Sequence, residues 1–209
     1  LASNNKYSLM GGLRSCAQLV SYEVGLGLSI VSLVLAAGTL STSEIVNQQS
    51  GTFAGLFPAW NVFLQPVGFA VFLICAFAEN NRLPFDLPEA EPELVGGYHT
   101  EYTGIRWGIF FLGEYASMIT MSALMVTLYL GGYHLPGLTT RDFGPVLTSL
   151  VSVGVFSAKV GAVIFFFMWV RWTLPRFKYQ SLMSLSWKVL LPLSLVNLAV
   201  TAVIVAGRG

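Results

Sequence analysis

Long apolar stretches separated by short polar ones dominate the sequence. A helix needs roughly 20 apolar residues to cross the hydrocarbon core of a bilayer. Five stretches meet this requirement, at about 18–40, 57–78, 107–130, 146–170 and 189–206. Helices satisfy their backbone polar groups internally, and the sequence lacks the alternating ten-residue segments of a β-barrel. The pattern therefore predicts an all-α, polytopic transmembrane helix bundle that forms a single domain over residues 1–209.

Composition agrees with a chain whose main partner is the lipid bilayer. Hydrophobic residues make up 55% of the chain and charged residues 10%, against about a quarter charged in soluble domains. The net charge of +1 leaves no basic stripe for phosphates, so a nucleic-acid partner is not expected. Cys16 and Cys75 lie in separate apolar segments without metal-ligand spacing, and we expect buried hydrophobes there, not a metal site.

Basic residues in the connections predict an orientation, because Lys and Arg concentrate on the inside of membrane proteins. One side carries Lys6, Arg14, Arg82, Arg106, Arg171, Arg176, Lys178 and Lys188. The other side carries Arg141 and Arg208. This distribution places the N-terminus and the connections 79–106 and 171–188 on the cytoplasmic or matrix side. The connections 41–56 and 131–145 are then expected to face outward.

Charged residues also lie within the predicted spans. Glu23, Glu114 and Lys159 each fall inside an apolar stretch, and Glu79 ends one. A charge at the bilayer centre costs about 2.5–3.5 kcal/mol on insertion scales, so such residues usually have a function. Burial and neighbouring charges tune carboxylates for proton transfer, and the four residues predict a polar path with Lys159 as electrostatic partner or gate. The alternative is structural: a Lys159–Glu pair, or side chains that reach an interface.

The connection 79–106 reads ENNRLPFDLPEAEPELVGGYHTEYTGIR. Its acidic residues are Glu79, Asp86, Glu89, Glu91, Glu93 and Glu101. Pro84, Pro88 and Pro92 recur every fourth residue and argue against a continuous helix. Because apolar residues alternate with the carboxylates, we expect an ordered loop packed against the bundle. A simply solvated acidic loop is the alternative.

Several motifs resemble one family. The run ENNRLPFDLPEAEPELVGGYHTEY is similar to the signature of the quinone-site membrane subunit of respiratory complex I, the NuoH family. SNNKYSLMGGLRSCAQLVSYEV, LYLGGY at 128–133 and WVRWTLPRFKY at 169–179 agree with the same family. That family has eight transmembrane helices, so the resemblance implies its C-terminal five, with the N-terminal helices missing. The initial Leu1 also suggests a piece of a longer polypeptide.

The resemblance implies a function: a membrane subunit of a proton-translocating NADH:quinone oxidoreductase, a translocase whose substrate is a quinone such as ubiquinone. It implies that Glu23, Glu79 and Glu114 belong to an acidic path for protons, to which the position of Lys159 within an apolar span adds this lysine. It also implies that the quinone chamber and acidic loop contain Arg82, Asp86, Glu89, Glu91, Glu93 and Glu101. No catalytic, cofactor-binding or metal-binding residue is expected in this chain, because the sequence has no Cys cluster or Gly-rich dinucleotide loop.

The resemblance further implies partners and a location. Flavin and iron–sulfur clusters are expected on partner subunits, which include hydrophilic quinone-module subunits on the inside face and small membrane and antiporter-like subunits. The expected location is the bacterial cytoplasmic membrane or the mitochondrial inner membrane. The family commonly reads R-Y-D-Q where this chain has Lys178-Tyr179-Gln180-Ser181, which puts a charge-pair role there in doubt, and Pro92 is unusual.

Two other functions stay open at this stage. One is the homologous subunit of a membrane-bound hydrogenase or of a ferredoxin- or deazaflavin-linked dehydrogenase complex. The other is a free-standing ion transporter, which would predict inverted repeats that the sequence does not display. The intact ENNR-type loop favours a quinone partner over both alternatives.

Overall fold

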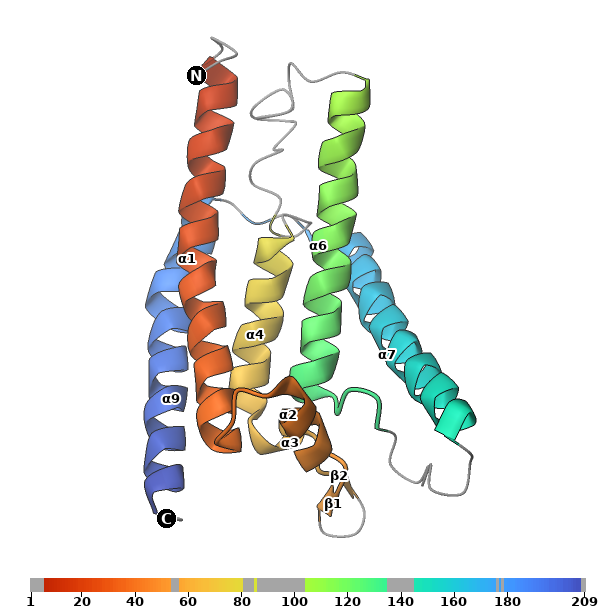
Figure 1. The fold of residues 1–209 in the computed structure, drawn as a ribbon. Helices are drawn as coiled ribbons and strands as arrows, with labels where there is room; N and C mark the ends of the chain where they lie inside the picture. Colours follow the sequence, from red (N-terminus) through yellow and green to blue (C-terminus); the bar gives the residue numbers. More distant parts are fainter. Residues whose placement is uncertain are drawn as a thin grey trace.

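The computed structural model describes residues 6–53, 57–80, 85, 104–134, 145–175, 177 and 179–207. Long helices dominate this part of the chain: α1 (Lys6–Ala37), α6 (Ile105–Tyr129), α7 (Pro145–Thr173) and a C-terminal run of α8 (Tyr179–Leu185), η3 (Ser186–Leu190) and α9 (Leu191–Ala206) (Figure 1). The strands found here, β1 (Thr52–Phe53) and β2 (Phe57–Pro58), form one two-residue antiparallel pair. The predicted all-α helix bundle is confirmed.

Four helical segments in the described residues are long and apolar enough to cross a membrane. They are Leu9–Ala37, Ile105–Tyr129, Val146–Thr173 and Tyr179–Ala206. The first and last begin about ten residues before the expected positions 18 and 189. Arg14 and Lys188 lie in these extensions, and the long aliphatic stems of such residues let a helix continue while the charge stays in water. Both helices therefore extend beyond the apolar stretches expected from the sequence.

The expected span 57–78 is divided in the structure. After β2 comes a single-turn helix, α3 (Asn61–Leu64), then a break at Gln65 with φ −132° and ψ 65°, then α4 (Pro66–Glu79). Pro66 has no N–H for a continuous helix and suits a first helical position, so α4 starts there. Its 14 residues extend about 21 Å, which is short of the roughly 30 Å hydrocarbon core.

This half-length helix is the core of the bundle. Val71, Phe72, Cys75 and Ala76 on α4 are fully buried. α1 runs antiparallel beside it, and a Cβ on Gly25 would lie 3.1 Å from the Cys75 Sγ, so this glycine lets the two helices approach closely. In Figure 1, α4 ends well below the upper ends of α1 and α6.

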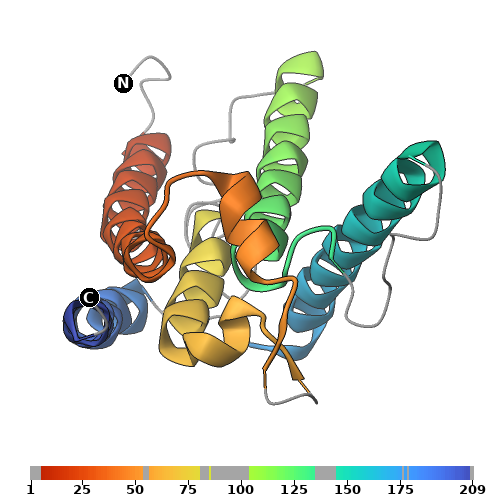
Figure 2. The same cartoon turned by 60° about the horizontal axis from the view of Figure 1, so that its bottom comes forward.

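The C-terminal helical run packs against α1. A short π-helical segment, η3, precedes Pro192, whose ring would otherwise clash with the carbonyl four residues earlier. The Ser186 hydroxyl donates to the Ser21 carbonyl at 2.9 Å, and the Trp187 indole donates to the Ser21 hydroxyl at 3.1 Å. α7 instead contacts α6 on the opposite side of the bundle and diverges from it toward Pro145 (Figure 2).

The end of the bundle opposite the α1 N-terminus is closed by α2 (Thr42–Gln48), α3 and the turn 130–134 after α6 (Figure 2). Gly131 and Gly132 have φ values of 71° and 52°, a conformation that L side chains rarely adopt. A Cβ on Gly131 would lie 2.5 Å from the Trp60 indole nitrogen, and one on Gly132 would lie 2.8 Å from Val46. Glycine is therefore required at both positions for this closure.

Candidate functional site

Polar side chains meet where α4 ends, inside the bundle. Glu79 is the last residue of α4 and is partly buried, and its Oε2 atom is buried without a hydrogen-bond partner. Gln18 of α1 and Ser117 of α6 lie beside this end, and each is 12 residues, or about 18 Å, from the start of its helix. Glu79 therefore lies at the level of the middle of its neighbours, away from the starts of α1 and α6, where charged groups normally reach water.

Two amides flank Glu79 and complete what we call the α4-end cluster: Gln18, Glu79 and Asn80. The Gln18 amide nitrogen donates to the Ala78 carbonyl at 2.8 Å and to the Phe85 carbonyl at 3.0 Å. The Ser117 hydroxyl donates to Asn80 Oδ1 at 3.2 Å. Gln18 is 1% exposed and Asn80 3%.

The α4-end cluster contains unmet hydrogen-bonding capacity. Among the described residues, three buried side-chain atoms lack a partner: Gln18 Oε1, Glu79 Oε2 and Asn80 Nδ2. All three belong to this cluster. An unpartnered buried polar atom costs about 1–3 kcal/mol, so their concentration at one place indicates a hydrated or functional site.

The structure brings two further predicted acids near this cluster. Glu23, on the exposed side of α1, is close enough to Glu79 for the two carboxylates to interact electrostatically. Glu114 lies one turn before Ser117 on α6 and is partly buried. Because residues three apart share a helix face, Glu114 and Ser117 lie on the same side of α6. Glu23 thus interacts with Glu79 directly, while Glu114 lies one turn along α6 from Ser117, which contacts Asn80.

The predicted residues of the acidic loop lie outside the described part of the chain. These residues are Arg82, Asp86, Glu89, Glu91, Glu93 and Glu101. Their roles stay predictions. Phe85, from the same connection, is described and buried: its ring lies 6.1 Å from that of Tyr22 on α1 and 5.8 Å from that of Phe177.

Lys159 lies elsewhere, near the α2 end of the bundle. Its ammonium group donates to the carbonyls of Leu130, Gly132 and His134, at 2.7, 2.9 and 2.6 Å. The same group lies 4.7 Å from the centre of the Trp60 ring, within range of a cation–π interaction. We call these groups the Lys159 cradle. An ammonium has three N–H donors, and all three are used here on backbone carbonyls, so the Lys159–Glu pair that the sequence left open as an alternative does not form among the described residues.

His134 adds an imidazole to the surroundings of Lys159. Burial lowers its pKa from the ordinary value of 6.5, and the positive charge of Lys159 lowers the pKa further. Its Nε2 atom lies 3.3 Å from the Asn47 side-chain oxygen, which also accepts a hydrogen bond from the Tyr133 hydroxyl. The turn after α6 is therefore connected to both α7 and α2.

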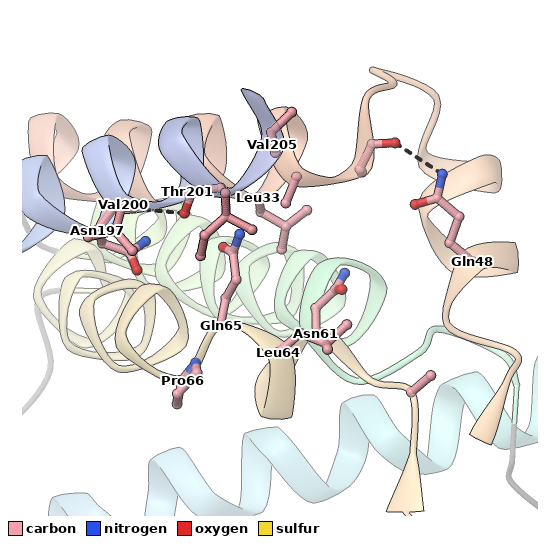
Figure 3. A pocket seen from close by; sticks show the side chains of 14 residues that line it. Leu33, Gln48, Asn61, Leu64, Gln65, Pro66, Asn197, Val200, Thr201 and Val205 are labelled. Carbon is pink, nitrogen blue, oxygen red and sulfur yellow. Dashed lines mark hydrogen bonds between the residues drawn. The ribbon is translucent and has the colours of Figure 1, made fainter. Parts of the chain in front are cut away.

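A second polar network connects α1, α4 and α9 near a cavity of about 270 Å³ (Figure 3). The Gln65 amide donates to the Ser32 carbonyl at 3.2 Å, and the Asn197 amide donates to the Ser32 hydroxyl at 2.9 Å. A Cβ on Gly68 would lie 3.2 Å from the Asn197 amide nitrogen, so this glycine leaves room for the network. In Figure 3, Gln65 and Thr201 lie together beside Leu33. The groups that form this network are amides, hydroxyls and a carbonyl, so it offers no carboxylate for proton transfer.

Sequence reasoning overlooked the amides and hydroxyls of these networks. Gln18 and Ser117 lie within expected spans, and Asn80 follows one, but their neutral side chains attracted no attention beside the charged residues. An amide in an apolar span is itself a signal, because it needs partners wherever lipid surrounds the helix. That signal could have identified Gln18, Gln65 and Asn197.

The long apolar helices of the described residues, packed around a buried half-length helix, define an integral membrane protein. The chain belongs to the family described as NADH dehydrogenase, whose profile matches residues 1–202. A relative from Rhodothermus marinus, NADH-quinone oxidoreductase subunit 8, is 50% identical over 211 residues, 98% of this chain and 61% of that protein. A subunit of the NADH-quinone oxidoreductase of Flavobacterium psychrophilum is 50% identical over 204 residues, 97% of this chain and 58% of that protein.

A third relative, a subunit of the NADH-quinone oxidoreductase of Cytophaga hutchinsonii, is 48% identical over 200 residues. The alignment covers 96% of this chain and 57% of that relative. The chain thus spans about three-fifths of the length of the curated relatives it matches. The resemblance to the complex I membrane subunit is confirmed at the level of the family.

Proposed function

We propose that the chain acts within the membrane subunit of a proton-translocating NADH:quinone oxidoreductase, where its carboxylates transfer protons between the quinone site and the membrane interior. The observation that carries this proposal is Glu79 at the end of a half-length helix, partly buried and with one oxygen unpartnered. Non-helical backbone at membrane depth is tolerated where protein buries it or water reaches it. A carboxylate at such a point can exchange a proton with water that a continuous helix would exclude.

Electrostatic coupling between carboxylates can control when each of them binds or releases a proton. Glu23 and Glu79 interact, so a proton on one carboxylate lowers the cost of charge on the other. Glu114 lies on the neighbouring helix, beside Ser117. We propose that protons pass among these three residues, and that the acidic loop with Arg82, Asp86, Glu89, Glu91, Glu93 and Glu101 lies between them and the quinone.

The proposal divides the chemistry between subunits. Quinone is the substrate, while the flavin and iron–sulfur clusters that deliver electrons are proposed for hydrophilic partner subunits. Small membrane and antiporter-like subunits are the proposed neighbours within the bilayer, with the acidic loop on the cytoplasmic or matrix side. The contribution of this chain is to take up, hold and release protons at Glu23, Glu79 and Glu114.

Carboxylate neutralisation in the assembled, membrane-embedded complex tests the proposal. Positioned proton-transfer groups typically contribute about 10²–10⁴-fold to rate, so Glu79→Gln and Glu114→Gln should each reduce quinone reduction and coupled proton translocation by at least about tenfold. Glu91→Gln tests the loop in the same way. Glu44→Gln is the matched control, because Glu44 is an exposed acid on α2 whose described partner is the Thr39 hydroxyl. Normal turnover and normal proton stoichiometry in all three variants would overturn the proposal.

A further inference from the structure

We propose that Gln18, Asn80 and Ser117 hold water against the Glu79 carboxylate and form the hydrogen-bonded connection from α4 to Glu114 on α6. The functional meaning of this connection rests on the proposed function. The water site itself rests on the geometry of the α4-end cluster.

The unmet atoms of the cluster match the capacity of water. Asn80 Nδ2 is a donor, while Gln18 Oε1 and Glu79 Oε2 are acceptors. A water molecule both accepts and donates, and buried waters typically make about three hydrogen bonds to otherwise unsatisfied groups. Because Gln18 and Asn80 are more than nine-tenths buried, bulk solvent does not provide this satisfaction. Water held within the cluster would give these three atoms their hydrogen-bond partners.

The orientation of Gln18 strengthens the argument. Its amide nitrogen donates to two carbonyls, Ala78 and Phe85, and an amide oxygen could not replace it, because an oxygen cannot donate to either. Gln18 Oε1 is therefore the atom left without a partner. The Ala78 carbonyl immediately precedes Glu79 and Asn80 in the chain, so the Gln18 amide is held beside both residues. This contact positions an acceptor next to the carboxylate.

Ser117 extends the cluster to the next helix. Its hydroxyl donates to Asn80 Oδ1 at 3.2 Å, which is a direct link between the α4 C-terminus and α6. Glu114 lies one turn away on the same face of α6. A hydroxyl can reorient to accept one proton and donate another, whereas a neutral amide only orients its neighbours. Asn80 and Gln18 are therefore positioning residues, and Ser117 with the held water provides the path.

Removal of single groups in the assembled complex tests this inference. Ser117→Ala and Asn80→Ala should slow coupled proton translocation about tenfold, the lower end of what positioned proton-transfer groups contribute, while Ser117→Thr, which keeps the hydroxyl, should restore most of it. Ser122→Ala is the matched control: Ser122 is a fully buried serine of the same helix whose hydroxyl bonds the Met118 carbonyl at 2.7 Å. It should behave as wild type.

An infrared difference spectrum supplies a readout that a purely structural role would not change. The band of the protonated Glu79 carboxyl is assigned by its loss in Glu79→Gln. Loss of the water contact in Ser117→Ala or Asn80→Ala should shift this band and reduce its response to D₂O. Ser122→Ala should leave both properties unchanged.

The outcomes separate this inference from the function on which it rests. If Glu79→Gln, Glu91→Gln and Glu114→Gln all leave turnover and stoichiometry normal, the proposed function fails. If those variants are impaired but Ser117→Ala and Asn80→Ala match Ser122→Ala in rate and spectrum, the water connection is wrong while the proposed function stands. Reduced assembly of Ser117→Ala with a wild-type Glu79 band in the assembled fraction would likewise overturn the connection.

Discussion

The Lys159 cradle and the α4-end cluster are both polar sites within an apolar bundle, but their hydrogen bonds are satisfied to different degrees. All three N–H groups of Lys159 meet backbone carbonyls, and its charge lies over the Trp60 ring. The α4-end cluster instead leaves one atom each of Gln18, Glu79 and Asn80 unpartnered. Among the described residues, a charge within the bundle is thus fully bonded at Lys159 and incompletely bonded at Glu79.

The physical reason lies in the cost of a change of state. A proton cannot leave or reach Lys159 without the loss of a charge-assisted hydrogen bond, and such bonds contribute about 1.5–3 kcal/mol each. Glu79 has an oxygen that no described protein group holds, so a proton or a water molecule can occupy it without displacing a partner. The first arrangement stabilises a fixed connection between α7 and the end of α6. The arrangement at Glu79 permits the exchange of a proton or a water molecule.

The largest expected effect comes from removing the charge of the cradle. Lys159→Met leaves the carbonyls of Leu130, Gly132 and His134 without their donor, and we expect a stability loss at least equal to one charged hydrogen bond, about 1.5–3 kcal/mol. Assembly yield and the melting temperature of the purified complex measure it. Lys188→Met, at an exposed lysine of η3, is the control. If Lys159→Met keeps wild-type stability but loses proton translocation, Lys159 acts in the proton path and not as a structural connection.

A smaller loss is expected when the glycine turn of the cradle is disturbed. Gly131→Ala places a Cβ 2.5 Å from the Trp60 indole nitrogen and imposes a left-handed conformation that alone costs about 1–2 kcal/mol. The same melting measurement should detect the loss. Gly154→Ala, on α7, is the matched control, since its Cβ would meet nothing within 4 Å. There the helix should gain up to about 1 kcal/mol.

Equal effects of Gly131→Ala and Gly154→Ala would show that the turn does not need glycine. That result would weaken the contrast between the Lys159 cradle and the α4-end cluster, because the turn at Gly131 would then tolerate a different backbone conformation. It would also remove the reason why the three carbonyls converge on one ammonium.

The smallest expected effect is a pH dependence carried by His134. Its pKa in the folded protein is lowered below 6.5, so the folded state resists protonation more than the unfolded chain does. Stability should therefore be fully present above about 6.5 and decline as the pH falls toward the lowered value. Melting temperatures of wild type and His134→Gln across this window measure the difference. A wild-type curve parallel to that of His134→Gln would contradict it.

Lys159→Met sharpens the same measurement, because it removes one of the two causes of the lowered pKa. The pKa of His134 in the folded protein should rise toward 6.5 in that variant, so the lower edge of the pH window should move upward and the window should narrow. An unchanged lower edge would mean that burial alone lowers the pKa of His134.

Residue types alone predicted the helix bundle and drew attention to Glu79. Runs of about 20 apolar residues have one economical solution in lipid, so the long helices followed directly from composition. The break between α3 and α4 was missed because hydropathy does not register where a helix stops. The Gln65–Pro66 pair carried that information in the sequence, and the apolar residues around it obscured the signal.

The sequence could not predict the hydrogen-bond partners of Lys159. Lys159 was expected to interact with a carboxylate because opposite charges attract, but the packing of α7 against the end of α6 offered three carbonyls instead. No local pattern reveals which acceptors an ammonium will meet, since Leu130 and Lys159 are 29 positions apart.

The sequence by itself determined that this chain lies in a membrane, that its helices carry acids, and to which family its motifs belong. Tertiary structure decided which polar groups are satisfied. It ended α4 halfway along its neighbours and placed Gln18 and Ser117 beside that end. The reason is physical: hydrophobicity is a property of each residue, whereas a hydrogen bond depends on where two distant residues meet.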